Sequence, residues 1–198
     1  MENDREKIAL HDVSKFYGDI LGVNRISLEI EPGITGLVGP NGSGKSTLMN
    51  LIAGLIPSTR GNIEVRGVTP SQPGTFFRQL GYCSQYDSFP VGVNGYEFIR
   101  NTLLIHGHDR TTAEALTLQA LQQVDLVKAA KKSVEAYSKG MRQRIKLAQA
   151  ICHQPDVLIL DEPLNGLNPM ARAQIIAMFR EFADTGKIVL ISSPILHE

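Results

Sequence analysis

The residue types and spacing best suited to chemistry form a glycine-rich loop in the first quarter of the chain. The loop reads Gly39, Pro40, Asn41, Gly42, Ser43, Gly44, Lys45 and Ser46. Glycines let the backbone turn tightly and bring its N–H groups against phosphate oxygens. The terminal lysine and hydroxyl can reach the β- and γ-phosphates and Mg²⁺. The pattern predicts a nucleotide-binding loop, and a chance glycine-rich turn before a helix is the alternative.

The segments on either side of the loop have the elements that such a loop needs. An apolar run that includes Ile34, Leu37 and Val38 indicates a strand before it, and residues 47–53 have helical spacing after it. A helix that begins directly after the loop points its positive end at a bound anion. We therefore expect the phosphates to lie against the loop and against Thr47 at the start of this helix.

A second candidate site follows an apolar strand near residue 160. Residues 157–160 are all apolar and lead directly into Asp161 and Glu162. A carboxylate at the carboxyl end of a strand in an α/β sheet lies at the ligand-binding edge. We expect Asp161 to hold Mg²⁺ through water together with the Ser46 hydroxyl, and Glu162 to activate water as a general base. The alternative is a strand that ends at a solvated acidic turn.

Composition and charge limit the class of protein. The 198 residues are 42% hydrophobic, and 20 Lys and Arg balance 20 Asp and Glu, so we expect no nucleic-acid partner. No apolar run is long enough to span a bilayer, and the charged residues 1–7 lack the apolar stretch of a signal peptide. The two cysteines, Cys83 and Cys152, have no metal-binding spacing. These features are typical of one large domain in a reducing, cytosolic compartment.

The order of the expected elements indicates an α/β fold with a helical insertion. They are strands at 7–13, 25–30, 62–65, 81–83, 157–160 and 188–192 and a helix at 169–183. The first two strands form an antiparallel pair, and the strand–helix–strand order at the end predicts a parallel sheet flanked by helices. Residues 94–152 have helical patterns. There, Thr111 and Glu114 predict a capping box for a helix that ends at Val124, and Ser138 caps a later helix.

A third motif lies at the start of the helix that Ser138 caps. It reads Tyr137, Ser138, Lys139, Gly140, Met141, Arg142 and Gln143. It resembles the signature motif of ATP-binding cassette (ABC) proteins, commonly Leu-Ser-Gly-Gly-Gln, in which Ser138 and Gly140 match and three positions depart. The run through Arg144 is similar to the variant in bacterial exporters whose ATPase subunits work with separate ABC-2-type membrane subunits. Physically, the hydroxyl, a glycine N–H and the helix N-terminus can cradle a γ-phosphate, and a capped helix without this role is the alternative.

The resemblance covers nearly the whole chain and implies a fold, an activity and partners. The implied fold is the α/β P-loop NTPase fold of ABC ATPases: a RecA-like core (about 1–86 and 152–198), an N-terminal antiparallel β subdomain and an inserted α-helical subdomain (about 87–151). These form a single ABC ATPase domain (1–198), and we expect a C-terminal part to be missing. The implied activity is ATP hydrolysis with ATP and Mg²⁺, driving a separate transmembrane permease. The chain would then be cytoplasmic, with a peripheral and indirect membrane association, and would form a head-to-tail dimer with a second ABC subunit.

Further residues take their roles from the same resemblance. Tyr17 lies where the family has an aromatic residue that stacks on adenine, and a core tyrosine is the alternative. Gln85 matches the Q-loop glutamine, which touches Mg²⁺ and couples to the membrane partner, expected to dock near the segment 87–108. Asn168 replaces the usual aspartate of the D-loop and loses its charge. The implied catalytic residues are Lys45, Gln85 and Glu162, and the implied Mg²⁺ ligands are Ser46, Gln85 and Asp161.

The most consequential departure from the family pattern lies near the end of the chain. The family has Ser-Ser-His or Ser-Thr-His after the last strand, and that histidine contacts the γ-phosphate. Here Pro194 follows Ser192 and Ser193, and His197 comes three residues after the proline. Proline has no side-chain donor and no backbone N–H. We therefore expect ATP binding to survive and hydrolysis to be slowed.

Two other functions remain as alternatives. A degenerate or regulatory cassette would bind ATP with weak hydrolysis, and Pro194 supports it. A non-transport ABC protein that acts on ribosomes or DNA usually carries tandem cassettes or a long coiled-coil insertion, and a basic surface. The single cassette, the absence of a long heptad run and the zero net charge argue against that class. The transported substrate is not readable, because the membrane subunits largely determine specificity in this family.

Overall fold

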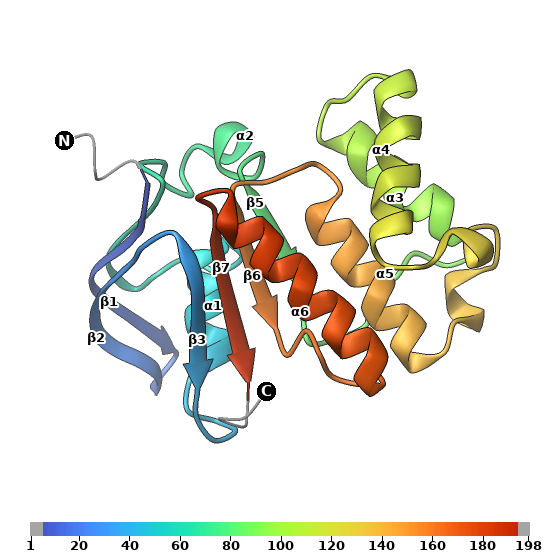
Figure 1. The fold of residues 1–198 in the computed structure, drawn as a ribbon. Helices are drawn as coiled ribbons and strands as arrows, with labels where there is room; N and C mark the ends of the chain where they lie inside the picture. Colours follow the sequence, from blue (N-terminus) through green and yellow to red (C-terminus); the bar gives the residue numbers. More distant parts are fainter. Residues whose placement is uncertain (1–5, 194–198) are drawn as a thin grey trace.

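The computed structural model describes residues 6–193, which form two β-sheets and surrounding helices (Figure 1). The strands are β1 (Ile8–Tyr17), β2 (Ile20–Ile30), β3 (Gly33–Val38), β4 (Arg60–Val65), β5 (Leu80–Cys83), β6 (Val157–Asp161) and β7 (Ile188–Ser193). The helices are α1 (Lys45–Ile52), α2 (Pro73–Phe76), α3 (Gly95–Ile105), α4 (Arg110–Gln123), α5 (Lys139–Ile151) and α6 (Pro169–Asp184), with 3₁₀ turns η2 (Val127–Ala129) and η3 (Val134–Ala136).

The smaller sheet is antiparallel, with the strand order β2-β1-β4. β1 pairs with β2 so that Ile8 lies opposite Ile30, and its other edge pairs with β4. β1 turns Ile8, Leu10 and Val13 into a core that also contains Met49 of α1. Each such buried side chain contributes about 1.5–3 kcal/mol of hydrophobic stabilisation. The antiparallel pair and the third short strand predicted from the sequence are confirmed.

The larger sheet is parallel, with the strand order β3-β7-β6-β5. Helix α6 crosses one face of this sheet and α1 lies on the other (Figure 1), so β6 is buried from Val157 to Asp161. Parallel strands end at one common edge, which therefore carries Val38, Cys83, Asp161 and Ser193. Open α/β sheets bind their ligands at this edge. The predicted strand–helix–strand order of the last third of the chain is confirmed.

Helices α3, α4 and α5 lie together beside the parallel sheet (Figure 1). Their apolar sides meet in a second core cluster, in which Leu103, Leu121 and Ile145 have no exposed surface. The same cluster includes Leu158 of β6 and Val189 of β7. Shared apolar packing therefore joins the helical layer to the sheet that carries the site.

The start of α4 differs from the sequence-based prediction. Asp109, not Thr111, is the N-cap, and its carboxylate accepts the backbone N–H groups of Thr111 and Thr112 at 2.9 and 3.1 Å. Glu114 forms an ion pair with Arg110 at 3.3 Å instead of closing a capping box. Aspartate is a stronger N-cap than threonine. The helix therefore begins before the predicted box, and that prediction is wrong.

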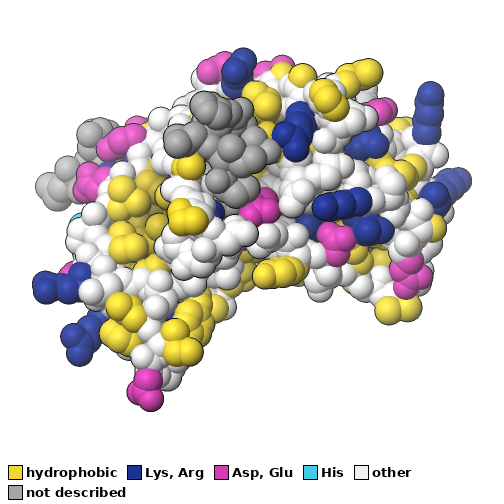
Figure 2. Space-filling model, turned by 90° about the horizontal axis from the view of Figure 1, so that it is seen from below, with side chains coloured by type: hydrophobic (Ala, Val, Ile, Leu, Met, Phe, Trp, Pro, Cys, Tyr) yellow, Lys and Arg dark blue, Asp and Glu magenta, His cyan; other side chains and the backbone are white. Residues whose placement is uncertain are grey.

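The surface of the described part of the chain has mixed character. Figure 2 views the molecule from the edge at which the parallel strands end, and basic and acidic side chains are interspersed on this face. Hydrophobic side chains gather mainly on the side of the antiparallel sheet. Across residues 6–193, no helix is both long and apolar enough to cross a membrane.

Candidate functional site

The glycine-rich loop joins the end of β3 to the start of α1. Gly42 and Gly44 have φ angles of 83° and 91°, in the left-handed region that favours glycine. A Cβ atom at Gly44 would also lie 3.0 Å from the carbonyl oxygen of Gly22 on β2. Conformation and close approach both require glycine at position 44. The loop is thereby fixed beside the antiparallel sheet.

The first turn of α1 is arranged to receive an anion. Gly44 at the N-cap has no side chain to accept from the first N–H groups of the helix, which suits these groups to a ligand. Lys45 Nζ donates to the carbonyl oxygens of Gly39 and Pro40 at 2.6 and 3.0 Å. These bonds hold the ammonium group over the loop, at the positive end of the helix dipole. This combination of helix dipole and positive charge is of the kind that can stabilise a polyphosphate.

One surface pocket gathers most of the residues predicted to bind the nucleotide. Its lining comes from the end of β1 and the start of β2, the glycine-rich loop with the start of α1, the segment after β5, and the residue that follows β6. The predicted residues that line it are Tyr17, Asn41, Gly42, Gly44, Lys45, Ser46, Thr47, Gln85 and Glu162. Segments far apart in the sequence therefore meet at the predicted edge of the sheet.

An exposed apolar face borders this pocket on the side of the antiparallel sheet. It consists of Tyr17, Ile20 and Leu21, whose exposed fractions are 46%, 71% and 47%. Lys15 Nζ lies 5.3 Å from the centre of the Tyr17 ring. An accessible aromatic ring beside a phosphate loop can stack on a base. Sequence reasoning identified Tyr17 but missed Ile20 and Leu21, the first residues of β2, although two apolar residues directly after a turn were a usable signal.

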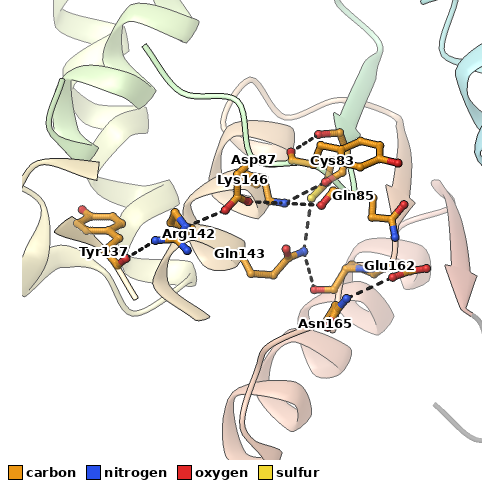
Figure 3. A network of polar contacts seen from close by, with 12 residues as sticks. Cys83, Gln85, Asp87, Tyr137, Arg142, Gln143, Lys146, Glu162 and Asn165 are labelled. Atoms are coloured by element: carbon orange, nitrogen blue, oxygen red, sulfur yellow. Dashed lines mark hydrogen bonds and ion pairs between the residues drawn. The ribbon is translucent and has the colours of Figure 1, made fainter. Parts of the chain in front are cut away.

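The two carboxylates at the end of β6 have different surroundings. Asp161 is buried, and the hydroxyl of Ser192 on β7 donates to its Oδ1. Glu162 has a φ angle of 50° and lines the pocket, and its backbone N–H donates to Ser192 Oγ at 2.9 Å. The side-chain amide of Asn165 donates to Glu162 Oε2 at 3.3 Å (Figure 3). Ser192, which was not among the predicted site residues, therefore links both acidic positions.

Replacing Ser192 with alanine should destabilise the protein by about 1–3 kcal/mol. Ser192 is 1% exposed, and the change removes one partner each from a buried carboxylate and a backbone N–H group. Urea unfolding of Ser192→Ala, compared with the exposed Ser88→Ala as control, measures this effect. Equal unfolding midpoints for the two variants would contradict the structural role of the hydroxyl.

Gln85 follows β5 and lies on the same pocket. Its side chain is exposed, and Figure 3 places it next to Glu162. The backbone carbonyl of Gln85 accepts from Lys146 Nζ of α5 at 3.3 Å. Gln85, the start of α1 and Glu162 therefore line one pocket within a single chain.

The signature residues lie apart from this pocket. Ser138 is the N-cap of α5, as predicted, and its hydroxyl accepts from the backbone N–H of Met141 at 3.3 Å. A Cβ atom at Gly140 would lie 3.1 Å from the carbonyl oxygen of Gly166. In Figure 1 the β3–α1 loop and the start of α5 both lie at the lower edge of the molecule, but the loop is at the left and the start of α5 is at the right. The chain does not bring Ser138 and Gly140 to its own phosphate loop.

Asn168 and Pro194 depart from the family pattern, and only Asn168 lies within the described residues. Asn168 is the N-cap of α6, and its side chain accepts from the backbone N–H of Ala171 at 2.8 Å. Aspartate and asparagine cap helices about equally well, so capping does not explain the asparagine. Pro194 and His197 lie outside the described residues.

Known proteins match this chain over almost its full length. A family model described as "ABC transporter" matches residues 23–165. An uncharacterized ABC transporter ATP-binding protein, YxlF of Bacillus subtilis (strain 168), is 33% identical, over 96% of this chain and 63% of the relative. The bacitracin transport ATP-binding protein BcrA of Enterococcus faecalis is also 33% identical, over 96% and 62%. The chain thus spans less than two thirds of the length of these relatives.

Solved structures agree with the fold. One described as the ATP-binding subunit of an ABC transporter has a TM-score of 0.87 and 26% identity, over 96% of this chain and 80% of the other. A dimeric ATP-binding cassette in a post-hydrolysis state, bound to ADP and Pi, has a TM-score of 0.88 and 22% identity, over 96% and 88%. The α/β architecture with one antiparallel and one parallel sheet is that of these cassettes. Since the family model also accounts for more than half of its residues, the chain belongs to the ABC transporter family.

Proposed function

We propose that this chain is the ATP-binding and ATP-hydrolysing subunit of an exporter-type ABC transporter. The family supports nucleotide binding and ATPase activity in general. The observation that carries the proposal for this chain is the meeting of Tyr17, Lys45, Gln85 and Glu162 in one pocket. The direction of transport rests on the signature variant and on relatives such as the bacitracin transport protein.

Each part of the pocket suits one part of ATP. The exposed ring of Tyr17 can stack on adenine, with Ile20 and Leu21 beside it. The backbone N–H groups of the glycine-rich loop and of Thr47 suit the phosphates. Lys45 exchanges the carbonyl oxygens of Gly39 and Pro40 for β- and γ-phosphate oxygens. Because Lys45 is already held over the loop, little reordering accompanies this exchange.

The donor set fits Mg²⁺ bound together with ATP. Within residues 6–193, no group of three or more His, Cys, Asp or Glu side chains could hold a metal ion by itself. Mg²⁺ usually needs only one or two carboxylates, with water and substrate phosphates completing its shell. Ser46, Gln85 and Asp161 offer oxygen ligands of that kind. When bound, the ion would supply positive charge that offsets the negative charge developing on the phosphates during transfer.

Glu162 is the proposed general base. Its carboxylate lines the pocket, and Asn165 donates to one carboxylate oxygen. In hydrolysis, a water oxygen bonds to the γ-phosphorus while its proton passes to Glu162, and the bond from that phosphorus to the leaving ADP oxygen breaks. Lys45 stabilises the charge on the phosphate oxygens.

The position of the signature motif supports a head-to-tail dimer. Ser138 caps a helix whose N-terminus lies away from the chain's own phosphate loop. We propose that it cradles the γ-phosphate held by a second ABC subunit. ATP would then favour the closed dimer, because only that state completes both contacts to the nucleotide. One of the structurally similar cassettes is a dimer, which supports the same arrangement.

A groove between the end of α1 and the end of α3 is the proposed docking site for the permease. Leu55, Phe77 and Ile105 line it with exposed fractions of 52%, 38% and 85%. Tyr82 also lines this groove. It lies near the end of β5 and is therefore close in sequence to Gln85. A partner segment that docks there would attach the chain indirectly to the cytoplasmic face of a membrane. Co-purification with a polytopic membrane protein would test this part of the proposal.

Restoring the family histidine tests the activity directly. We expect Pro194→His to raise the kcat of ATP hydrolysis about tenfold or more, because a side-chain donor near the γ-phosphate would be regained. The Kd for ATP should stay within about threefold, since the phosphate loop is unchanged. Steady-state ATPase rates and nucleotide titrations measure both quantities. No gain in kcat would sink the idea that Pro194 limits hydrolysis, and no ATP binding in either protein would contradict the proposed function.

A further inference from the structure

Helix α5 is bonded to the backbone of the loop that carries Gln85. Lys146 on this helix is 5% exposed, although it is a lysine. Its ammonium group donates to the carbonyl oxygens of Ser84 and Gln85 at 3.1 and 3.3 Å and forms an ion pair with Asp87 Oδ1 at 3.0 Å (Figure 3). Three donors therefore meet three acceptors, all within four consecutive residues of the Gln85 loop.

Arg142, one helical turn before Lys146, holds the same carboxylate. Its Nε donates to Asp87 Oδ2 at 2.7 Å, and its Nη1 donates to the carbonyl oxygen of Tyr137 at 2.6 Å. Residues four apart lie on the same face of a helix, so both cations face the loop. Asp87 is thus held at both oxygens, and Arg142 extends the contact to the residue before Ser138.

A third side chain of α5 reaches the other wall of the pocket. Gln143 is 5% exposed, and its amide donates to the carbonyl oxygen of Pro163 at 2.9 Å. Pro163 directly follows Glu162. The helix that begins at Ser138 therefore touches the segments of both Gln85 and Glu162 (Figure 3).

Burial of the Lys146 charge calls for an explanation beyond stability. Burying an ammonium group costs several kcal/mol, and an apolar residue of similar volume is often as stable or more so. Here the ammonium group keeps three polar partners, and Asp87 is held at one oxygen by Lys146 and at the other by Arg142.

We propose that Lys146, together with Asp87, is a positioning residue that fixes Gln85 relative to helix α5. Helix α5 and the Gln85 loop then move as one unit. When the N-terminus of α5 approaches the nucleotide of a second subunit, Gln85 moves with it. Lys146 itself is not among the residues that line the pocket. The inference rests on the proposed role of Gln85 in hydrolysis.

The test compares Lys146→Met, Lys146→Arg and Asp87→Asn in the full-length protein, with Gln85→Ala as reference and the exposed Lys132→Met as control. Methionine keeps much of the buried stem but removes the charge and all three donors. We expect Lys146→Met to lower kcat about 10- to 100-fold, because displacing a reacting group by about 1 Å can cost this much. The KM and the Kd for ATP should stay within about threefold, because the phosphate loop is untouched.

Coupling and rescue separate positioning from a merely structural role. Asp87→Asn should lower kcat in the same way, and the double variant should be no worse than Lys146→Met, because the two residues act through one contact. Lys146→Arg keeps the charge and should recover most of the lost kcat. Urea unfolding of each variant shows whether it is folded, and Asp87→Asn carries the test if Lys146→Met does not fold.

The outcomes distinguish this inference from the proposed function. Full activity of Gln85→Ala would contradict the proposed role of Gln85 in hydrolysis, on which this inference rests. If Gln85→Ala is impaired while Lys146→Met and Asp87→Asn have normal kcat, the positioning role is overturned. It is equally overturned if the two changes are additive and Lys146→Arg gives no recovery.

Discussion

Replacing Glu162 with glutamine should lower the kcat of ATP hydrolysis by about 10²–10⁴-fold, the usual contribution of a positioned general base. Glutamine keeps the size of the side chain and an oxygen for the bond from Asn165. It loses the carboxylate that takes the proton from the attacking water. Glu162 lies at the pocket wall and not on the phosphate loop, so the Kd for ATP should change by less than about threefold.

Steady-state ATPase rates and titration with a fluorescent ATP analogue measure the two effects of Glu162→Gln. The matched control is Glu114→Gln on α4, where Glu114 forms an exposed ion pair with Arg110 outside the pocket. Such a pair contributes about 0.2–1 kcal/mol at most, so the control should keep its activity. A kcat of Glu162→Gln within about twofold of wild type would contradict the assignment.

Replacing Lys45 with alanine should weaken ATP binding about 10- to 100-fold. Hydrogen bonds to charged groups contribute about 1.5–3 kcal/mol each, and every 1.4 kcal/mol changes Kd tenfold. Lys45 is already held over the loop by Gly39 and Pro40, so its ammonium group is close to where the phosphates would lie. Hydrolysis should fall as well, because the charge on the transferred phosphate loses a partner.

Isothermal titration with ATP and Mg²⁺ measures the Kd of Lys45→Ala. Lys128→Ala, which changes an exposed lysine in η2, controls for the general loss of one positive charge. If both variants bind ATP as tightly as the wild type, the glycine-rich loop is not the phosphate site.

The phosphate loop could be predicted from sequence because its determinants are local. The strand, the glycines and the helix that begins at Lys45 are consecutive, and steric limits alone require glycine at position 44. The strand–helix–strand order likewise predicted the parallel sheet. Parallel pairing then brings Asp161 to the same edge as the loop, whatever the intervening chain does.

The site residues that could not be identified from the sequence depend on contacts between residues far apart in the chain. Ser192 bonds Asp161 only because β6 and β7 pair in one register, which sets these two residues opposite each other. Lys146 reads in the sequence as a solvent-exposed helix residue, since lysine is rarely buried without a partner. Its partners lie on the loop after β5, and no local pattern identifies them. The wrong start of α4 has another cause, the competition between two neighbouring caps.

If Ser138 of one subunit completes the phosphate site of another, two subunits should associate only when ATP is bound. The measurement is the mass in solution, by light scattering, of Glu162→Gln with and without ATP and Mg²⁺, alone and combined with Ser138→Asp. Aspartate keeps the N-cap of α5 but places a negative charge where a γ-phosphate would lie. Ser138→Asn, which caps the helix without this charge, is the matched control.

We expect ATP to double the mass of Glu162→Gln and of its Ser138→Asn variant. With Ser138→Asp the mass should not change, although the Kd for ATP at the chain's own phosphate loop stays the same. An ATP-dependent dimer that is indifferent to Ser138→Asp, or no association of Glu162→Gln with ATP, would contradict a site shared between two subunits.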